Sequence, residues 1–347
     1  MQALKLFLFP ILFLIQLLYR VITFSRNMFY DHKILAITKF KINIISIGSL
    51  KFGGAGKTPL VEYLIKEHKN QKLAVLSRGY KRKRKGFLIA SKNHTAFDVG
   101  DEVSQILNKN PNLLIAVSEN RVFGVKNLIK KNKNIKTIIL DDAHQHRKIE
   151  RDCNIIVTEY DELYSKDKLF PLGNLRESKT GAKRAEIIVI TKCPKNISLE
   201  KKHEIQKNLK LNKNQKIFFS YIKYNKLSNC LTGKFEDFRT NEKYFLLTGI
   251  GNSKPLLQYL KSKKVNIYHF KYPDHHYFKK KELENLILKA KREQTKNLII
   301  TEKDFYRLNK VDIDLLSSYF KLFYIKIEFD FINNEKLMFN KQILKFI

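Results

Sequence analysis

A glycine-rich segment that begins at Gly53 has the residue types that bind phosphate. It reads Gly53-Gly-Ala-Gly-Lys-Thr58 and follows an apolar run at residues 42–47. Glycines let the backbone curl so that its N–H groups point at phosphate oxygens, while the lysine supplies a positive charge and the threonine a hydroxyl for Mg²⁺. Pro59 suits the first turn of a helix, whose amino-terminal end favours a bound anion. We therefore predict a phosphate-binding loop made of Gly53, Gly54, Ala55, Gly56, Lys57 and Thr58.

Two carboxylates follow a second apolar run. The segment Thr137-Ile-Ile-Leu-Asp-Asp142 ends in Asp141 and Asp142. Ligands of parallel-sheet proteins bind beyond the carboxyl ends of the strands, and in P-loop proteins an acid at that place holds Mg²⁺ directly or through water. Asp141 or Asp142 is therefore expected to join Thr58 at a magnesium ion, and the sequence leaves open which of the two does so.

A third apolar run ends in Thr191-Lys192, which is similar to part of the guanine-reading motif of GTPases. That motif needs an aspartate where this chain has Pro194. GTP is therefore disfavoured as the nucleotide.

Seven further motifs occur in order along the chain. They are Ser77-Arg-Gly-Tyr-Lys-Arg82, Val99-Gly-Asp-Glu102, Asp141-Asp-Ala-His-Gln-His-Arg147, Phe170-Pro-Leu-Gly-Asn-Leu-Arg-Glu177, Gly249-Ile-Gly251, Asp274-His-His276 and Thr301-Glu-Lys-Asp304. Together with the phosphate loop they resemble the motifs of the tetraacyldisaccharide 4′-kinases, the lipid A 4′-kinases of Gram-negative bacteria. Ala143-His144 and Asn174 depart from the residues usual in that family, and these departures lie between the charged positions.

The resemblance implies ATP- and Mg²⁺-dependent phosphorylation of the 4′-hydroxyl of an acylated glucosamine disaccharide 1-phosphate, at the cytoplasmic face of the bacterial inner membrane. A sugar hydroxyl is a weak nucleophile, so the reaction needs a group that accepts its proton and cations around the transferring phosphoryl group. By resemblance, Asp101 is the base and His275 its partner, while Lys57 and Arg176 neutralise charge. Considered alone, Asp101 would cap a helix and His275 would be a structural histidine.

The resemblance also assigns metal and substrate residues. Glu102 and Glu177 join Thr58, Asp141 and Asp142 as candidates for binding Mg²⁺ or positioning water. Six cations in the eight residues 78–85 surround Tyr80, a charge density suited to the 1-phosphate of the acceptor or to anionic headgroups. The residues implied to contact the acceptor are Arg78, Tyr80, Arg121 and His146.

The net charge of the chain restricts its possible partners less than the magnitude of that charge suggests. Among 347 residues, 67 Lys and Arg stand against 33 Asp and Glu, a formal net charge of +34. Heavy use of Lys, Asn and Ile throughout is typical of A+T-rich coding, which accounts for part of this charge. The remaining positive field favours nucleotides, nucleic acid or an anionic membrane. Nucleic acid ranks last, because the sequence contains no recognition motif for it.

An apolar segment at residues 6–19 continues past Arg20 into residues 21–24. A helix needs about 20 apolar residues to span a bilayer, so the segment is marginal for a full span. Cationic residues follow it, and a small-residue cleavage site does not. We therefore expect an uncleaved membrane anchor that keeps the rest of the chain on the cytoplasmic side. The alternative is a buried core helix.

From residue 42 onward, short apolar runs alternate with helical patterns. This alternation predicts an α/β fold with a mostly parallel sheet of the P-loop type and helices on both faces. The expected strands are 42–47, 73–76, 138–140, 155–157 and 187–190, and then 244–247, 267–270, 298–300 and 323–329; the expected helices of the second series are 254–263 and 279–294. Residues 223–241 lack helical periodicity and are read as a connection.

These patterns divide the chain into three parts. We expect a membrane helix at 1–28, a P-loop kinase domain at 29–222 and a smaller α/β domain at 223–347 that closes over the nucleotide. The three cysteines, Cys153, Cys193 and Cys230, lie too far apart for a disulfide scaffold or a Cys-rich zinc site, which fits a reducing compartment. The sequence implies no oligomer.

One departure from the usual P-loop pattern supports an alternative function. Where that pattern has its first glycine, five residues before Gly56, this chain has Lys51. The lysine and the two adjacent glycines resemble the variant P-loop of dimeric positioning ATPases. A membrane-associated ATPase switch is therefore the alternative, and such a switch would consume ATP with lipid vesicles alone.

Overall fold

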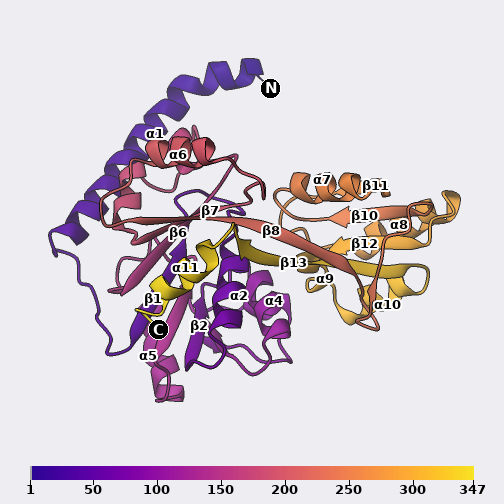
Figure 1. Ribbon diagram of the computed structural model, residues 1–347, viewed down its shortest axis with the longest axis horizontal. Coiled ribbons are helices and arrows are strands. Elements are labelled where there is room, and N and C mark those ends of the chain that lie inside the picture. Colours follow the sequence, from indigo (N-terminus) through magenta and orange to yellow (C-terminus); the bar gives the residue numbers. More distant parts are fainter. Residues whose placement is uncertain (1) are drawn as a thin grey trace.

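A computed structural model describes residues 2–347, with side chains described from residue 8 onward. Its centre is one mixed sheet of 13 strands in the order β11-β10-β12-β13-β8-β7-β6-β1-β5-β2-β4-β3, with β9 beside β8 (Figure 1). The predicted α/β fold with a mostly parallel sheet is confirmed.

The first part of the chain forms a parallel sheet with helices on both faces. Ile45 of β1 packs in the same core as Leu64 of α2, whereas Ile44 packs with Leu128 of α5 on the opposite face. Both faces are covered, so these strands are almost continuously apolar. The elements are β1 Asn43–Gly48, α2 Lys57–Glu67, β2 Leu73–Ser77, β3 Leu88–Ile89, α3 Ala96–Val99, α4 Asp101–Lys109, β4 Leu114–Val117, α5 Arg121–Lys131, β5 Thr137–Asp141, β6 Cys153–Glu159, β7 Ile187–Thr191 and α6 Leu199–Leu209.

The second series has the same design. Phe245 of β10 packs with α8 residues such as Leu286, and Leu246 packs with Leu260 of α7 on the other face. The elements are β8 Lys216–Asn229, β9 Phe235–Glu236, β10 Lys243–Thr248, α7 Lys254–Ser262, β11 Asn266–Lys271, α8 Lys280–Arg292, β12 Asn297–Thr301, α9 Glu302–Phe305, α10 Lys310–Ser317, β13 Lys321–Phe331 and α11 Glu335–Ile343.

Two long antiparallel strands, β8 and β13, join the two parts of the sheet (Figure 1). The segment read as a connection, 223–241, therefore begins as the second half of β8 rather than as a loop. The chain also returns to its first part, because Phe331 of β13 and Phe339 of α11 pack in the core that contains Ile45. The domain boundary at residue 222 stays a prediction, and the last residues of the second domain lie on the first core.

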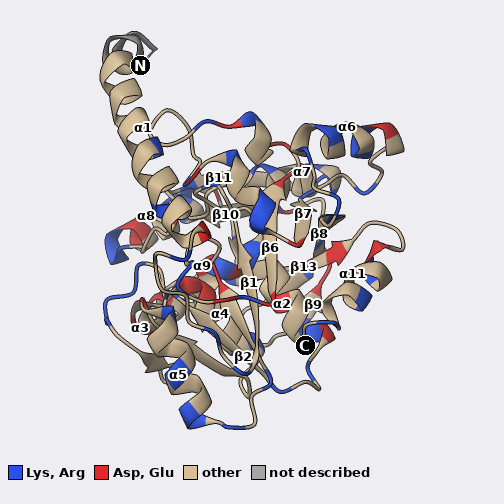
Figure 2. Cartoon of the chain, turned by 90° about the vertical axis from the view of Figure 1, so that its left-hand side faces the viewer, with Lys and Arg blue, Asp and Glu red and all other residues tan. Residues whose placement is uncertain are grey.

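The N-terminal helix α1, Gln2–Asp31, runs along the outside of the first part and extends beyond it (Figure 1). Among the described residues, it is one helix long and apolar enough to cross a membrane, over Leu8–Asp31. Leu14, Leu18 and Phe24 are each more than 60% exposed, which excludes a buried core helix. Figure 2 shows few charged residues along α1. The helix is longer than the apolar segment 6–24 and is consistent with association with a membrane.

Candidate active site

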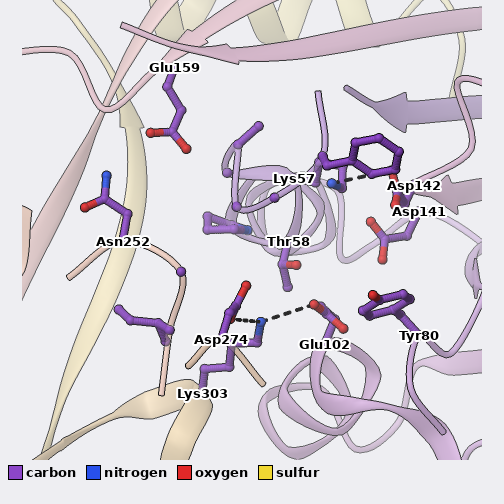
Figure 3. Close-up of a pocket in the computed structure, with 18 of the residues that line it drawn as sticks. Lys57, Thr58, Tyr80, Glu102, Asp141, Asp142, Glu159, Asn252, Asp274 and Lys303 are labelled. Atoms are coloured by element: carbon purple, nitrogen blue, oxygen red, sulfur yellow. Dashed lines mark ion pairs between the residues drawn. The ribbon is translucent and has the colours of Figure 1, made fainter. Parts of the chain in front are cut away.

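A cavity of about 1390 Å³ lies between the two parts of the chain, at the carboxyl ends of the parallel strands. The phosphate loop lines one side, and Asp274 and His275 line the other. Figure 3 shows Lys57, Thr58 and Asp141 facing the same space as Lys303 from α9. Tyr19, Ile22, Thr23 and Arg26 extend the lining to helix α1.

The phosphate loop is shaped by glycine conformation and held by strand β7. Gly56 precedes α2 with φ 89°, a backbone angle that side-chain-bearing residues rarely adopt. A Cβ at Gly56 would also lie 3.2 Å from the Cβ of Thr191. The Thr191 hydroxyl donates to the Ala55 carbonyl at 2.8 Å, and the Lys192 ammonium donates to the Gly54 carbonyl at 3.0 Å. The Thr-Lys pair, which does not fit a guanine-reading motif, therefore supports the loop.

Asp142 is neutralised by two cations from different segments. Arg176 Nη1 lies 2.8 Å from Asp142 Oδ1, and Lys57 Nζ lies 3.4 Å from the same oxygen. Burial would raise the pKa of Asp142, but Lys57 and Arg176 outweigh burial and lower it. Arg176 also lies over the ring of Phe52, 5.1 Å from its centroid. The two cations predicted for the transferring phosphate thus meet at one carboxylate.

Asp141 has the opposite environment. Its Oδ2 accepts a hydrogen bond from the Ser77 hydroxyl at 3.1 Å, while its buried Oδ1 has no hydrogen-bond partner among residues 2–347. Burial, followed by the nearby charges of Asp142 and Glu102, raises the pKa of Asp141 to about 6. A bound cation would give this unpartnered carboxylate oxygen a partner and would offset the repulsion from the neighbouring carboxylates.

The donors at this place fit magnesium that arrives with a nucleotide. Thr58, Glu102 and Asp141 offer the hard oxygen ligands that Mg²⁺ prefers. Within the described chain, no group of three or more His, Cys, Asp or Glu residues is arranged to hold a metal by itself. Mg²⁺ usually combines one or two carboxylates with water and substrate phosphates, so a complete protein cage is not needed.

His275 and Asp101, which are far apart in sequence, are brought together. His275 Nδ1 lies 2.7 Å from Asp101 Oδ2. Arg307 donates to the same oxygen through Nε at 3.0 Å and Nη2 at 2.8 Å. Burial would raise the pKa of Asp101, but the bonds from His275 and Arg307 lower it to about 2.

The two groups of the pair lie at different depths. Asp101 is 2% exposed and lies behind His275, whose ring lines the cavity. In the tautomer of His275 that donates its Nδ1 proton to the ionised Asp101, Nε2 is the acceptor nitrogen. That Nε2 lies 3.4 Å from Lys303 Nζ, which also lines the cavity.

Comparison with known proteins agrees with the site. The family model described as tetraacyldisaccharide-1-P 4′-kinase, LpxK, matches residues 8–347. A Flavobacterium johnsoniae protein named tetraacyldisaccharide 4′-kinase is 43% identical over 342 residues, 97% of this chain and 96% of that protein. This chain belongs to the LpxK family. A second protein of that name, from Flavobacterium psychrophilum, is 40% identical over 98% of this chain and 97% of its own length.

A solved LpxK structure shares the fold. The crystal structure of LpxK from Aquifex aeolicus in complex with ATP is 28% identical and superposes with a TM-score of 0.74. The alignment covers 99% of this chain and 100% of that one.

One candidate of the predicted metal set lies outside the cavity. Glu177 is expected to bind Mg²⁺ or position water, but its carboxylate is buried and does not line the cavity. Arg184 Nη2 lies 2.8 Å from Oε2 of Glu177, Asn27 of α1 donates to the same oxygen at 2.8 Å, and Gln145 donates to Oε1 at 3.1 Å. These donors satisfy the carboxylate, so the prediction of Glu177 as a metal ligand does not fit the structure. Glu177 instead ties α1 to the loops below it.

The four residues assigned to the LpxK acceptor all line the cavity. Arg78 and Tyr80 are exposed to it, and the Tyr80 ring lies 5.4 Å from the ring of His275. Arg121 is buried and donates to the carbonyls of Ser118 and Asp141. Burial, followed by the charge of Arg121, lowers the pKa of His146 to about 4, so His146 is neutral at pH 7. Arg78 and Tyr80 are therefore freer than Arg121 to meet a ligand.

Two residues of this site were given no role in the sequence analysis. Arg307 and Lys303 contact the His275–Asp101 pair from α9 and the turn that follows it. Arg307 stands three residues after Asp304, a spacing at which helical side chains meet, and this spacing was the available signal. Lys51 is paired within the chain, 2.9 Å from Glu162 and 3.1 Å from Asp167.

Proposed function

We propose that this chain transfers the γ-phosphoryl group of ATP to the 4′-hydroxyl of tetraacyldisaccharide 1-phosphate in lipid A biosynthesis. Family membership over residues 8–347 supports this activity, and the Aquifex aeolicus relative was crystallised with ATP. The observation that carries the proposal is one cavity lined both by the phosphate loop and by His275, which is hydrogen-bonded to the buried Asp101. A nucleotide and a hydroxyl acceptor can meet there.

The loop 53–58 would hold the ATP phosphates on the amino-terminal end of α2. Thr58, Asp141 and Glu102 would hold magnesium, which supplies charge neutralisation for the phosphates. Asp142 instead holds Lys57 and Arg176 in place, so that both cations face the transferring group without reorganisation.

His275 is the group that accepts the proton of the 4′-hydroxyl. Its Nε2 is on the cavity side, whereas Asp101 is buried and its Oδ2 is occupied by three donors. A carboxylate with a pKa of about 2 is also a poor proton acceptor at neutral pH. Asp101 therefore orients the imidazole and stabilises its protonated form, which reverses the roles inferred from sequence.

Helix α1 would place the cavity at a membrane. Its apolar side chains are exposed, and Tyr19 and Ile22 reach the cavity lining. The acyl chains of the acceptor can then remain near the bilayer while its sugar enters the site. The cationic residues that follow α1 favour the cytoplasmic face of the inner membrane.

The test is product analysis by mass spectrometry. Purified protein in detergent is incubated with ATP, Mg²⁺ and tetraacyldisaccharide 1-phosphate, and the lipid should gain one phosphoryl group on the distal sugar. Lys57→Ala should abolish most of this gain, whereas Lys66→Ala at the far end of α2 serves as the matched control.

ATP consumption with lipid vesicles alone, without a phosphorylated lipid, would instead support the ATPase switch. The pairing of Lys51 with Glu162 and Asp167 of its own chain gives that alternative no structural support.

A further inference from the structure

We propose that Arg307 is a positioning residue for phosphoryl transfer, which fixes Asp101 and the loop of His275 so that the imidazole faces the cavity. This inference rests on the proposed kinase function. Arg307 lies in the second part of the chain and Asp101 in the first, 206 residues apart.

Three nitrogens of the Arg307 guanidinium have partners. Nε and Nη2 donate to Asp101 Oδ2, at 3.0 and 2.8 Å, and Nη1 donates to Asp304 Oδ1 at 2.6 Å. The Arg307 side chain is fully buried. A planar guanidinium in a buried site fixes the direction of its acceptors, which a single ammonium cannot do. Asp101 is thus held at one oxygen by a rigid donor pair.

Asp304 holds the guanidinium from the other side. Its Oδ2 accepts hydrogen bonds from the Gly249 amide at 2.9 Å and from the Thr301 hydroxyl at 2.6 Å. Gly249 follows strand β10 and Thr301 ends strand β12, so Arg307 is anchored to the sheet of the second part. The Thr301-Glu-Lys-Asp304 motif, which has no role in the sequence analysis, supplies this anchor.

Arg307 also organises the backbone around His275. Its Nη1 donates to the carbonyls of Gly249 and His276 at 3.2 Å each. The Gly249 carbonyl also accepts the His275 amide at 3.1 Å. His275 itself has φ 60°, a left-handed conformation that costs free energy in a residue with a side chain. The surrounding bonds hold it there, and Arg307 makes two of them.

The Arg307 side chain therefore fixes the positions of both Asp101 and His275. It holds the Asp101 carboxylate directly and the His275 backbone through two carbonyls. Because Asp101 begins α4 of the first part, the pair is complete when the two parts of the chain are docked. Loss of Arg307 would let the imidazole turn or shift, and a displacement of 1 Å at a reacting group costs about 10²-fold in rate.

The experiment measures kcat and the KM for ATP of Arg307→Gln, alone and combined with His275→Ala. We expect kcat to fall about 10²-fold with the KM for ATP unchanged, because Arg307 does not touch the phosphate loop. In the His275→Ala background, Arg307→Gln should lower kcat no further. A merely structural role would lower kcat equally in both backgrounds and would raise the KM for ATP. Arg292→Gln, at the exposed end of α8, is the matched control and should retain full activity.

Two further variants keep the inference testable if Arg307→Gln does not fold. Arg307→Lys retains the charge but cannot bridge Asp101 and Asp304, so its kcat should also fall. Asp304→Asn removes one anchor and should give a smaller loss, again absent in the His275→Ala background. Wild-type kcat in either variant would overturn the inference. Lack of lipid phosphorylation by the wild-type protein would instead overturn the proposed function, so the two failures are distinguishable.

Discussion

His275 and Asp101 form a pair in which burial decides the chemistry of each member. Asp101 is enclosed with three donors on one oxygen, whereas the His275 ring lines the cavity. Removal of the imidazole should therefore remove the proton acceptor and leave a space that a small base can fill.

We predict that His275→Ala lowers kcat by about 10²–10⁴-fold and that added imidazole restores part of it. The restored rate should rise with the concentration of unprotonated imidazole, measured in steady-state phosphorylation assays. Asp101→Ala, which removes the orienting group, should not respond to imidazole. Rescue of Asp101→Ala by formate, with a near-normal His275→Ala, would show that Asp101 is the base.

Glu177 shows how a carboxylate in one of the ordered motifs can stabilise the fold. Burial would raise its pKa, but the charge of Arg184 and the hydrogen bonds from Arg184 and Asn27 act against burial, and the pKa is lowered from its ordinary value of 4.5. When the pKa of a carboxyl group is lower in the folded than in the unfolded protein, the group stabilises the protein at a pH above the unfolded-state pKa. This stabilisation is lost as the pH falls through the folded-state pKa.

Glu177→Gln should therefore lower the free energy of unfolding at pH 7 by about 3 kcal/mol, because Arg184 loses its charged partner. The variant should also lose less stability than the wild type as the pH falls below 4.5. Denaturant unfolding over a pH series measures both effects. Glu150→Gln, which breaks the exposed pair with Lys39, is the control and should change little. A steeper requirement for Mg²⁺ in Glu177→Gln would restore the metal assignment.

At the scale of elements, one ammonium joins three helices at the cavity. Lys109 of α4 lies 2.8 Å from Glu62 of α2 and 2.7 Å from Glu302 of α9. Helix α2 starts at the phosphate loop, α4 starts at Asp101, and α9 leads to Arg307. The contact therefore couples the positions of the elements that carry the phosphate loop, Asp101 and Arg307.

Lys109→Met would leave two buried carboxylates without a cation. Burial already raises the pKa of both Glu62 and Glu302, and the loss of Lys109 removes a charge that lowers them. When the pKa of a carboxyl group is higher in the folded than in the unfolded protein, the protein becomes less stable as the pH rises above the unfolded-state pKa. We expect the variant to be destabilised by about 3–5 kcal/mol at pH 8 and by less at pH 5.

Thermal unfolding at the two pH values measures this difference. Lys126→Met, on the exposed side of α5, is the matched control. An equal loss of stability at pH 5 and pH 8 would argue against an electrostatic role of Lys109.

At the scale of the whole molecule, one sheet carries both halves of the site. The long strands β8 and β13 pass from the first part to the second, and β13 and α11 return to the first core. The cavity lies across this junction and extends to α1, which is exposed along its apolar face.

Replacement of Leu14, Leu18 and Phe24 of α1 by Ser should release the protein from membranes, since exposed apolar area drives its partition. Co-sedimentation with anionic vesicles measures the bound fraction. Activity toward a detergent-solubilised acceptor should fall less than activity toward an acceptor in vesicles. The corresponding control replaces the exposed Leu337 and Met338 of α11 by Ser. Unchanged sedimentation of the α1 variant would assign membrane binding to another surface.

Most strands and helices and the phosphate loop could be predicted from the sequence, because strand and helix periodicity, turn glycines and the Lys-Thr pair are local signals. The predicted strands 42–47 and 298–300 correspond to β1 and β12, although the short β4 was missed. The ordered motifs also indicated the family.

The contacts, burial and charge states of the site residues could not be predicted from the sequence, because they depend on long-range packing. Asp101 meets His275 across 174 residues and Arg307 across 206, so neither contact leaves a periodic trace in the chain. Asp101 is buried behind His275, Glu177 is buried against Arg184, and Oδ1 of Asp141 has no partner among residues 2–347. Each of these environments depends on which segments pack over the carboxylate. Charge states follow from that packing, since desolvation and nearby charges shift each pKa.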